Sequence, residues 1–243
     1  MAIPSFFSTE LSVALLENDQ PSITLSESES GHAVRSRRLR EGQVVNVLNG
    51  QGITAHGKIN VINKRAVEIG FDSYDVKKQV SPTLTIATAI PKGDRQKVMV
   101  DMLTQLGVSE IIPLDCEHSV TRYSDNLRKK WQRAAIESCK QSQNPWLPHI
   151  ANGCGLNRLI DKPDYCKVYA DAVGTNMASV GFSVGDSEIS NLMVIIGPEG
   201  GFSSAEIALL AGQNIKAVSL NNHILRTEAA AITAIAQFSQ VNW

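Results

Sequence analysis

The clearest pattern in the chain is a short apolar run followed at once by a glycine-rich turn. Residues 192–196 read Leu-Met-Val-Ile-Ile with no polar interruption, which is typical of a strand buried on both faces of a parallel sheet. Residues 197–201 then read Gly-Pro-Glu-Gly-Gly, and such a turn lets the backbone adopt positive φ and approach a ligand closely. We therefore predict a buried strand that ends in a candidate ligand-binding loop.

A helix is predicted directly after this loop. Ser203 and Glu206 have the spacing of a capping box, and apolar residues follow at positions 207, 209, 210 and 211. Backbone N–H groups at that helix start would face the loop and favour a polar or anionic ligand. When the glycine-rich turn is considered alone, a plain strand-turn-helix joint is the better explanation.

The first third of the chain has a β pattern instead. Strands are predicted over residues 44–48, 53–62 and 65–71, with turns at Asn49-Gly50 and Asn63-Lys64, because Asn and Gly tolerate positive φ. The pattern indicates a small β-barrel or meander. A polar stretch over residues 74–81 follows and is predicted to link two domains, residues 1–75 and 76–243.

From the linker onward the pattern alternates between strands and helices. Strands are predicted over residues 84–90, 108–114, 166–170 and 216–220, and helices over 94–106 and 125–143. In the first of these helices we expect an inward face of Val98, Met102, Leu103 and Leu106, with Gly107 ending the helix. This alternation predicts an α/β fold with a parallel sheet covered by helices on both faces.

Composition and charge narrow the possible partners. The chain has 243 residues, 43% hydrophobic and 19% charged, with a formal net charge of −1. These values are typical of a soluble globular protein and give no global attraction for nucleic acid. One local exception is an arginine cluster at positions 35, 37, 38 and 40, whose guanidinium groups suit phosphate oxygens. A solvated helix face offset by nearby glutamates is the alternative interpretation.

Several other classes of site find no support. No stretch has the pattern of a signal peptide or the length of a membrane span, so we expect a cytoplasmic protein with no membrane partner. The four cysteines are irregularly spaced, which indicates neither a disulfide framework nor a metal site. The glycine pairs at 50–52 and 153–155 lack the third glycine of a dinucleotide-binding fingerprint.

A second motif completes the picture. Residues 220–231 read LNNHILRTEAAA and begin 14 residues after Glu206, the last residue of the GPEGGFSSAE stretch. This pair of motifs resembles the SPOUT superfamily of S-adenosylmethionine-dependent RNA methyltransferases, and within it the RsmE family, which methylates N3 of a uridine in 16S ribosomal RNA. The resemblance implies an N-terminal PUA-like β-barrel domain, a methyltransferase domain with a C-terminal trefoil knot, and a homodimer formed by that domain. It also implies 16S ribosomal RNA or the 30S subunit as the partner.

The resemblance assigns residues to the two ligands. For S-adenosylmethionine it implies the backbone-rich set Ile196, Gly197, Glu199, Gly200, Gly201, Leu220, Asn222, Ile224 and Leu225. For RNA it implies His32, Arg35, Arg38, Lys92 and Arg95. The chain departs from the family pattern at several positions, which are Ser5, Met102, Gln105, Lys140, Asn144, Asn221, His223 and Ala229.

The chemistry of the implied reaction suggests roles for Arg226 and Glu228. Uridine N3 must lose a weakly acidic proton before it attacks the methyl group. Arg226 could hold the resulting negative charge, and Glu228 could accept the proton or orient Arg226. An Arg-Glu pair that only fixes the helix start is the alternative. Two other functions also stay open at this point: a non-catalytic RNA-binding or ribosome-assembly factor, and a phosphate-binding α/β enzyme whose glycine loop holds a nucleotide.

Overall fold

The computed structural model describes residues 3–63, 66–176 and 191–239, and the chain forms two compact units. The first unit contains Met1–Gln79 and Ile136–Leu147, and the second contains Val80–Ala135 and Pro148–Trp243. Helix α4 (Asp125–Ser142) begins in the second unit, and its last turns belong to the first. The chain therefore passes from one unit to the other three times.

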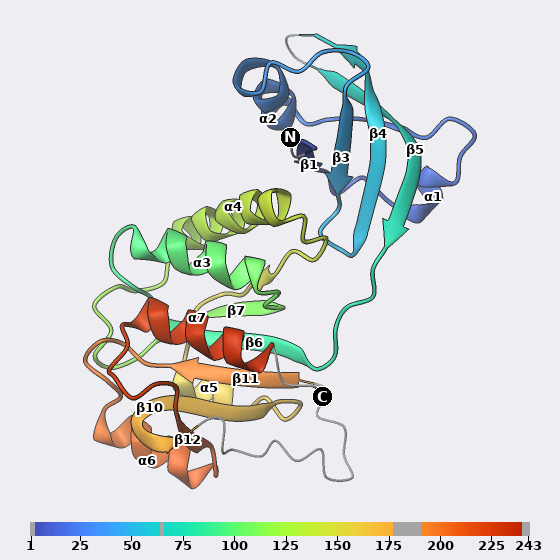
Figure 1. Ribbon diagram of the computed structural model, residues 1–243. Coiled ribbons are helices and arrows are strands. Elements are labelled where there is room, and N and C mark those ends of the chain that lie inside the picture. Colours follow the sequence, from blue (N-terminus) through green and yellow to red (C-terminus); the bar gives the residue numbers. More distant parts are fainter. Residues whose placement is uncertain (1–2, 64–65, 177–190, 240–243) are drawn as a thin grey trace. The chain divides into compact units, whose positions relative to one another are not determined.

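The first unit is built on a curled five-stranded sheet with the order β1-β3-β4-β5-β2 (Figure 1). Its strands are β1 (Ser5–Phe7), β2 (Ser22–Thr24), β3 (Val44–Leu48), β4 (Ile53–Ile62) and β5 (Val67–Val76). Strand β4 pairs antiparallel with β3 on one side and with β5 on the other, in agreement with the predicted β meander. The second predicted turn includes Lys64, which lies outside the described residues.

The unit's core lies on one face of this sheet, under two short helices. These are α1 (Val13–Leu16) and α2 (Glu27–Gly31), and α2 continues into a π-helical turn, η1 (His32–Ser36). Phe6, Val45 and Ile69 are fully buried in the core cluster. Fully burying a side chain of this kind contributes roughly 1.5–3 kcal/mol each, so the apolar alternation of the strands is the main source of stability here.

The second unit contains a parallel seven-stranded sheet, whose main path runs β12-β10-β11-β6-β7-β8. Its strands are β6 (Thr83–Ala89), β7 (Glu110–Asp115), β8 (His149–Ile150), β9 (Cys154–Gly155), β10 (Cys166–Asn176), β11 (Asn191–Ile196) and β12 (Lys216–Ser219). Strand β11 pairs with β10 on one side and β6 on the other. Leu192 to Ile196 are all buried, which confirms the prediction from the unbroken apolar run.

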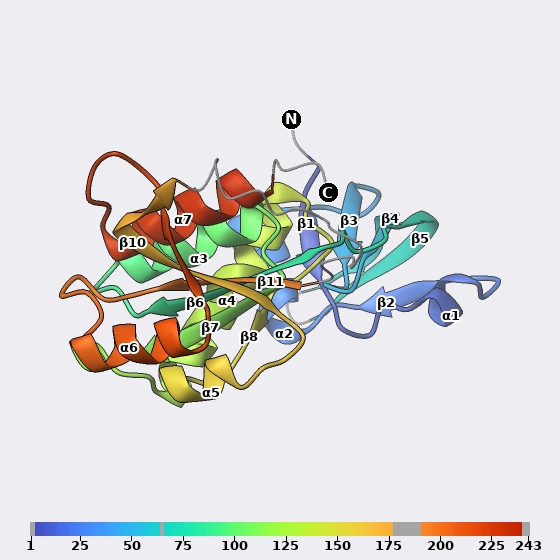
Figure 2. The same cartoon turned by 90° about the horizontal axis from the view of Figure 1, so that it is seen from below.

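Helices cover both faces of this sheet (Figures 1 and 2). Helices α3 (Arg95–Gln105) and α7 (Thr227–Phe238) lie together on one face, and α5 (Leu156–Ile160) and α6 (Ser204–Gly212) lie on the other. The predicted capping box of α6 is present, because Ser203 Oγ accepts from Glu206 N at 3.3 Å and Glu206 Oε2 accepts from Ser203 N at 2.8 Å. The predicted α/β fold is confirmed, and the trefoil knot stays a prediction.

The predicted inward face of α3 is partly wrong. Val98 and Met102 are 55% and 36% exposed, whereas Met99 and Leu103 are fully buried. Apolar residues at 98–100 and 102–103 allow two faces about 100° apart on a helix, and packing against α7 selects the 99/103 face. Leu103 was assigned correctly, and Gly107 ends the helix with φ of 80° as expected.

Two strands also extend beyond the predicted limits. Strand β5 continues to Val76 because Tyr74 and Asp75 pair with Ala55 and Thr54 of β4, so the first part of the predicted linker is strand. Strand β10 continues past Ala170 to Asn176, with a register shift against β12. Both extensions consist mostly of exposed residues without a regular apolar alternation. Backbone pairing at a sheet end does not require buried apolar side chains, so the sequence pattern did not predict them.

Candidate active site

The carboxyl ends of the parallel strands bring four loops to one edge of the sheet in the second unit. The loops follow β6 (residues 90–94), β7 (116–124), β11 (197–203) and β12 (220–226). In open α/β sheets, ligands bind at this edge. Two adjacent hollows lie here, and Glu199 lines both of them.

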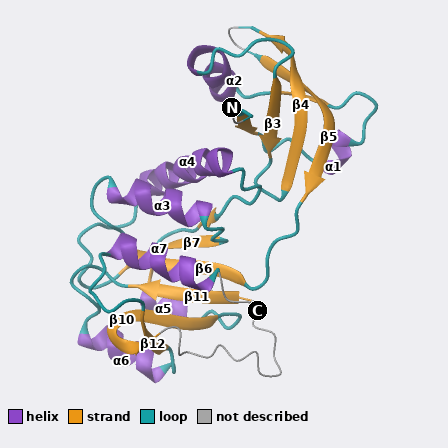
Figure 3. Cartoon of the chain, in the orientation of Figure 1, coloured by secondary structure: helices purple, strands orange, loops and turns teal. Residues whose placement is uncertain are grey.

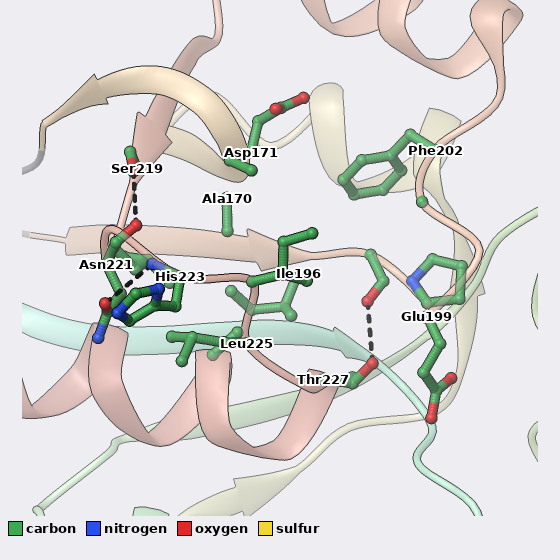
Figure 4. Close-up of a pocket in the computed structure, with 17 residues that line it drawn as sticks. Ala170, Asp171, Ile196, Glu199, Phe202, Ser219, Asn221, His223, Leu225 and Thr227 are labelled. Carbon is green, nitrogen blue, oxygen red and sulfur yellow. Dashed lines mark hydrogen bonds between the residues drawn. The ribbon is translucent and has the colours of Figure 1, made fainter.

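The first hollow, which we call the glycine-loop pocket, has a volume of about 280 Å³. Figure 4 shows Ala170, Ile196 and Leu225 along its middle, with Asn221 and His223 at one end and Phe202 and Glu199 at the other. Its full lining is Ala170, Asp171, Ala172, Ile196, Gly197, Pro198, Glu199, Gly201, Phe202, Ser219, Leu220, Asn221, His223, Ile224, Leu225, Thr227 and Ala230. Small or apolar side chains and exposed backbone make up most of this surface.

Hydrogen bonds from neighbouring segments hold the pocket's loops. Gly201 N donates to Pro198 O at 2.9 Å, which closes the glycine turn. Thr227 Oγ1, at the start of α7, donates to Gly197 O at 3.3 Å. In the other loop, Asn221 Oδ1 accepts from His223 N at 3.1 Å. The two loops are thus fixed by their own turns and by the helix that follows.

At two positions of this pocket the structure favours glycine, at one because of the backbone conformation and at the other because of limited space. Gly201 has φ of 72°, in the left-handed region where a side chain is strained, and no atom lies within 4 Å of the place a Cβ would occupy. A Cβ on Gly197 would lie 3.0 Å from the ring of Phe202, which packs edge-on against Tyr169. The loop therefore presents bare backbone on its open side.

The second hollow, which we call the charged hollow, has a volume of about 520 Å³. It is lined by Lys92, Arg95, His118, Val120, Glu199, Gly200 and Arg226. Three of these side chains are permanently cationic at neutral pH, so the surface suits an anionic ligand such as a phosphate or a deprotonated base.

Arg95 links the elements around this hollow. Its Nη1 lies 3.3 Å from Glu199 Oε1 of the glycine loop and 3.5 Å from Glu228 Oε2 of α7. The Glu228 side chain is only 13% exposed. Arg226 is exposed, and among the described residues it has no carboxylate partner. In the described ranges, the cations of this hollow without a carboxylate partner are therefore Lys92 and Arg226, while Arg95 is partly neutralised.

The loop after β7 forms the remaining wall. His118 Nδ1 lies 3.1 Å from Gly201 O, and Arg122 Nη1 donates to Cys116 O at 2.9 Å. Burial raises the pKa of the Cys116 thiol to about 12, with a smaller contribution from Glu206. This thiol is therefore protonated at neutral pH and is not available as a nucleophile.

The structure gathers most of the predicted cofactor residues in one place. Seven of them line the glycine-loop pocket, namely Ile196, Gly197, Glu199, Gly201, Leu220, Ile224 and Leu225. Gly200 lines the charged hollow instead. Asn222 is exposed and lies outside the described lining of either hollow. The roles of these residues stay predictions.

The predicted RNA and catalytic residues fall into two groups. Lys92, Arg95 and Arg226 line the charged hollow, and Glu228 reaches it only through Arg95. His32, Arg35 and Arg38 belong to the first unit.

The arginine cluster of the first unit is exposed. Arg37 Nε donates to His32 Nε2 at 3.2 Å, and the Arg35 guanidinium lies over Gly31. Within the described ranges no carboxylate pairs with any of the four arginines. Glu29 pairs with Lys140 at 2.8 Å instead. The positive charge of the cluster is therefore not offset by an ion pair.

Sequence reasoning missed three residues that the fold brings to the site. Asp171 and Phe202 line the glycine-loop pocket, and His118 lines the charged hollow. Asp171 lies in the part of β10 beyond the predicted strand end at residue 170, and His118 lies in a loop without periodicity. In the described part of the chain, no group of three or more His, Cys, Asp or Glu residues is arranged to hold a metal ion, and no helix is long and apolar enough to cross a bilayer.

Two known families match this chain, each over a different part of the sequence. Residues 78–239 match the family described as RNA methyltransferase domain, and residues 25–72 match the RNA methyltransferase PUA domain. The chain belongs to this family of RNA methyltransferases. The residues of both hollows fall within the first match, and the arginine cluster falls within the second.

Relatives in this methyltransferase family resemble the chain over nearly its full length. Ribosomal RNA small subunit methyltransferase E of Rickettsia conorii is 33% identical over 232 residues, which cover 92% of this chain and 91% of that protein. The protein of the same name from Bacillus subtilis is 26% identical, with 91% of each chain covered.

A solved structure shares the fold of this methyltransferase chain. Ribosomal RNA small subunit methyltransferase E of Neisseria gonorrhoeae, crystallised with S-adenosyl methionine, superposes with a TM-score of 0.85 at 24% identity. The alignment covers 98% of this chain and 97% of the other. Both the PUA-like sheet and the parallel-sheet domain are therefore family features.

Proposed function

We propose that this protein transfers a methyl group from S-adenosylmethionine to N3 of a uridine in 16S ribosomal RNA. The observation that carries the proposal is the pair of adjacent hollows, which share Glu199 but differ in lining. One suits a small cofactor that has both an apolar ring and charged groups, and the other suits an anionic nucleic-acid group. The names of the related proteins from Rickettsia conorii and Bacillus subtilis support small-subunit ribosomal RNA as the substrate.

The glycine-loop pocket fits S-adenosylmethionine by the chemistry of its lining. Ile196, Leu220 and Leu225 offer apolar contacts for an adenine ring, and the bare backbone around Gly201 offers donors and acceptors for its edges. The carboxylates of Asp171 and Glu199 suit the cofactor's positive charges. When bound, S-adenosylmethionine supplies an electrophilic methyl group on a sulfonium sulfur.

The charged hollow would hold the target nucleotide. In this proposal Arg226 donates to the carbonyl oxygens of the uracil and stabilises the anion formed when N3 loses its proton. Arg95, Glu199 and Glu228 form an ion-pair network that fixes the glycine loop against α7. Lys92 would bind a neighbouring phosphate. Each residue acts by position and charge, without a covalent intermediate.

RNA affinity would come largely from the first unit. The exposed cluster of Arg35, Arg37, Arg38 and Arg40 has no ion-pair partner in the described ranges, so it can neutralise phosphates without first breaking a salt bridge. This assignment agrees with the match of residues 25–72 to a PUA domain. The RNA substrate would therefore be bound at two places, the arginine cluster and the charged hollow.

We also propose a homodimer formed by the second unit. Val98 and Met102 are exposed apolar residues on α3, and a dimer contact would remove them from water. Sedimentation velocity should give a dimer for the parent protein, and Val98→Glu with Met102→Glu should shift it toward a monomer. A parent that sediments as a monomer would contradict the proposal.

The function is tested by methyl transfer to defined RNA. The protein is incubated with labelled S-adenosylmethionine and 30S subunits from a strain that lacks this activity, and digested 16S RNA is analysed by mass spectrometry. We expect 3-methyluridine at one position. RNA binding without methyl transfer would indicate a non-catalytic assembly factor, and nucleotide binding without S-adenosylmethionine binding would indicate a phosphate-binding enzyme.

A further inference from the structure

His118 lies in the loop after β7 and contacts the glycine turn that lines both hollows. Its ring lines the charged hollow, and its Nδ1 lies 3.1 Å from the carbonyl oxygen of Gly201, which lines the glycine-loop pocket. A Cβ added to Gly200 would lie 3.1 Å from His118 Cβ, so the side chain packs directly on the glycine turn. The ring therefore faces the charged hollow while it is held against the turn that lines the glycine-loop pocket.

The contact with Gly201 fixes the proton arrangement of the imidazole. A carbonyl oxygen can only accept a hydrogen bond, so Nδ1 must carry the proton. In a neutral imidazole the other nitrogen, Nε2, then has a free lone pair. Among the described residues His118 is exposed, and no hydrogen bond to its Nε2 competes for that lone pair.

The other potential bases around the hollow are engaged. Glu199 and Glu228 both face the Arg95 guanidinium, at 3.3 Å and 3.5 Å. The remaining polar lining consists of cations, Lys92 and Arg226. His118 is therefore the lining residue that combines a free lone pair with direct access to the hollow.

We propose that His118 Nε2 is the general base that takes the proton from uridine N3, an assignment that rests on the proposed function. The N3–H bond breaks as the proton moves to Nε2, and the N3 electron pair forms a bond to the methyl carbon. The bond from sulfur to that carbon breaks, and sulfur keeps the electron pair. The imidazolium, still bonded to Gly201 O through Nδ1, then releases its proton to water. Arg226 balances the charge of the uracil anion.

The charges around His118 are mixed. Lys92, Arg95 and Arg226 face it from three neighbouring segments, and Glu199 faces it from the glycine loop. Glu117 precedes it on its own loop, where the Glu117 N–H donates to Glu206 Oε1 of α6 at 3.0 Å. Three cations and one carboxylate therefore line the hollow together with His118.

The tautomer can be tested without cofactor or RNA. In the protein labelled with ¹⁵N at histidine, long-range proton–nitrogen spectra distinguish a protonated ring nitrogen from a bare one. We expect Nδ1 of His118 to be protonated and Nε2 to be bare, with the signals assigned by their loss in His118→Asn. The opposite tautomer, with the proton on Nε2, would overturn the inference.

The catalytic role is tested with three variants in single-turnover methylation of 30S subunits over a pH series. His118→Asn keeps an amide N–H near the position of Nδ1 but has no base, whereas His118→Ala removes both features. His149→Asn is the matched control, because His149 Nδ1 also has an acceptor at 3.1 Å, Glu110 Oε1, but lies at the amino-terminal edge of the sheet.

We expect His118→Asn to bind S-adenosylmethionine normally yet to methylate about 10²-fold more slowly at neutral pH, the usual scale of general-base catalysis. Its rate should rise with pH toward that of the parent, and added imidazole should restore part of the activity of His118→Ala. His149→Asn should match the parent. Melting curves check that each variant is folded.

Other outcomes separate the inference from the proposed function. A His118→Asn enzyme with the parent's rate and pH profile would show that His118 is not the base. A Glu228→Gln enzyme that is slow and recovers at high pH, beside an active His118→Asn, would move the role to Glu228. A parent protein that transfers no methyl group to the subunit would refute the proposed function itself, and this inference with it.

Discussion

The two adjacent hollows at the carboxyl edge of the sheet are lined by different kinds of groups. The glycine-loop pocket is bounded by backbone and small apolar side chains, held in place by turn hydrogen bonds. The charged hollow is bounded by long side chains from separate segments, joined by ion pairs. A surface made of backbone depends on φ and ψ rather than on side-chain identity, so it should tolerate many substitutions. A surface made of side chains should not.

The strongest test of this difference is Arg226→Ala in the charged hollow. Loss of the cation should slow methylation on the order of 10²-fold or more, because the uracil anion would lose its stabilising charge. Cofactor affinity should stay near that of the parent, and higher pH should recover part of the rate. Single-turnover kinetics and a cofactor titration measure the two effects.

Lys216→Ala is the matched control for this variant, since Lys216 is exposed at the start of β12, at the other edge of the sheet. A lysine in place of Arg226 should restore little if two hydrogen bonds are needed. An alanine variant that methylates at the parent rate would mean that Arg226 only supports the helix start.

The second test addresses the backbone of the glycine-loop pocket. Gly201→Val places a β-branched residue at φ of 72°, and such strain costs on the order of 1–3 kcal/mol. We expect cofactor affinity to fall about 10- to 100-fold, because the loop would relax out of its binding conformation. Isothermal titration checks the affinity, and Gly212→Val, at a glycine without positive φ, is the control. Unchanged affinity in a folded Gly201→Val protein would contradict a backbone-made site.

The third test extends the comparison to the arginine cluster, another surface made of side chains. Replacing Arg35 and Arg38 by alanine should weaken RNA binding and reduce its dependence on salt by about one phosphate contact per arginine. Cofactor affinity should not change. Lys58→Ala is the control, because Lys58 already pairs with Asp72. Equal salt dependence in the double variant and the parent would identify the cluster as a solvated helix face.

The smallest effect is expected at His223, whose side chain lines the glycine-loop pocket. Its backbone N–H holds the turn through Asn221 Oδ1, and His223→Ala keeps that hydrogen bond. We expect cofactor affinity within about twofold of the parent, well below the 1.4 kcal/mol that a tenfold change represents. A tenfold loss would show that side chains matter in this pocket as well.

Local sequence patterns predicted the elements whose burial follows from their own residues alone. The run at residues 192–196 was predicted to be a doubly buried strand and is one, and Ser203 and Glu206 form the capping box that their spacing predicted. Val98 shows the limit, because adjacent apolar residues offer a helix two possible faces. The partner that selects one face, α7, lies more than a hundred residues later.

The site was predicted to the extent that its residues are neighbours in sequence. The glycine turn and the loop before α7 supplied most of the glycine-loop pocket. His118 and Asp171 could not be found in this way, because only the strand order places the loop after β7 and the strand β10 near the glycine turn. A histidine two residues after a buried cysteine has no distinctive local signal. Knowledge that β7 and β11 flank β6 would have been needed to select it.

The return of residues 136–147 to the first unit constrains how this protein is made. Gly52 N donates to Pro145 O at 2.9 Å, and a Cβ on Gly52 would lie 2.6 Å from the Trp146 ring. Glu29 forms an ion pair with Lys140. During translation, at roughly 5–20 residues per second, the N-terminal sheet must wait for these residues to leave the ribosome. Several elements of the second unit are synthesised in that interval. A fragment that ends at Gln79 would therefore lack the partners of Gly52 and Glu29.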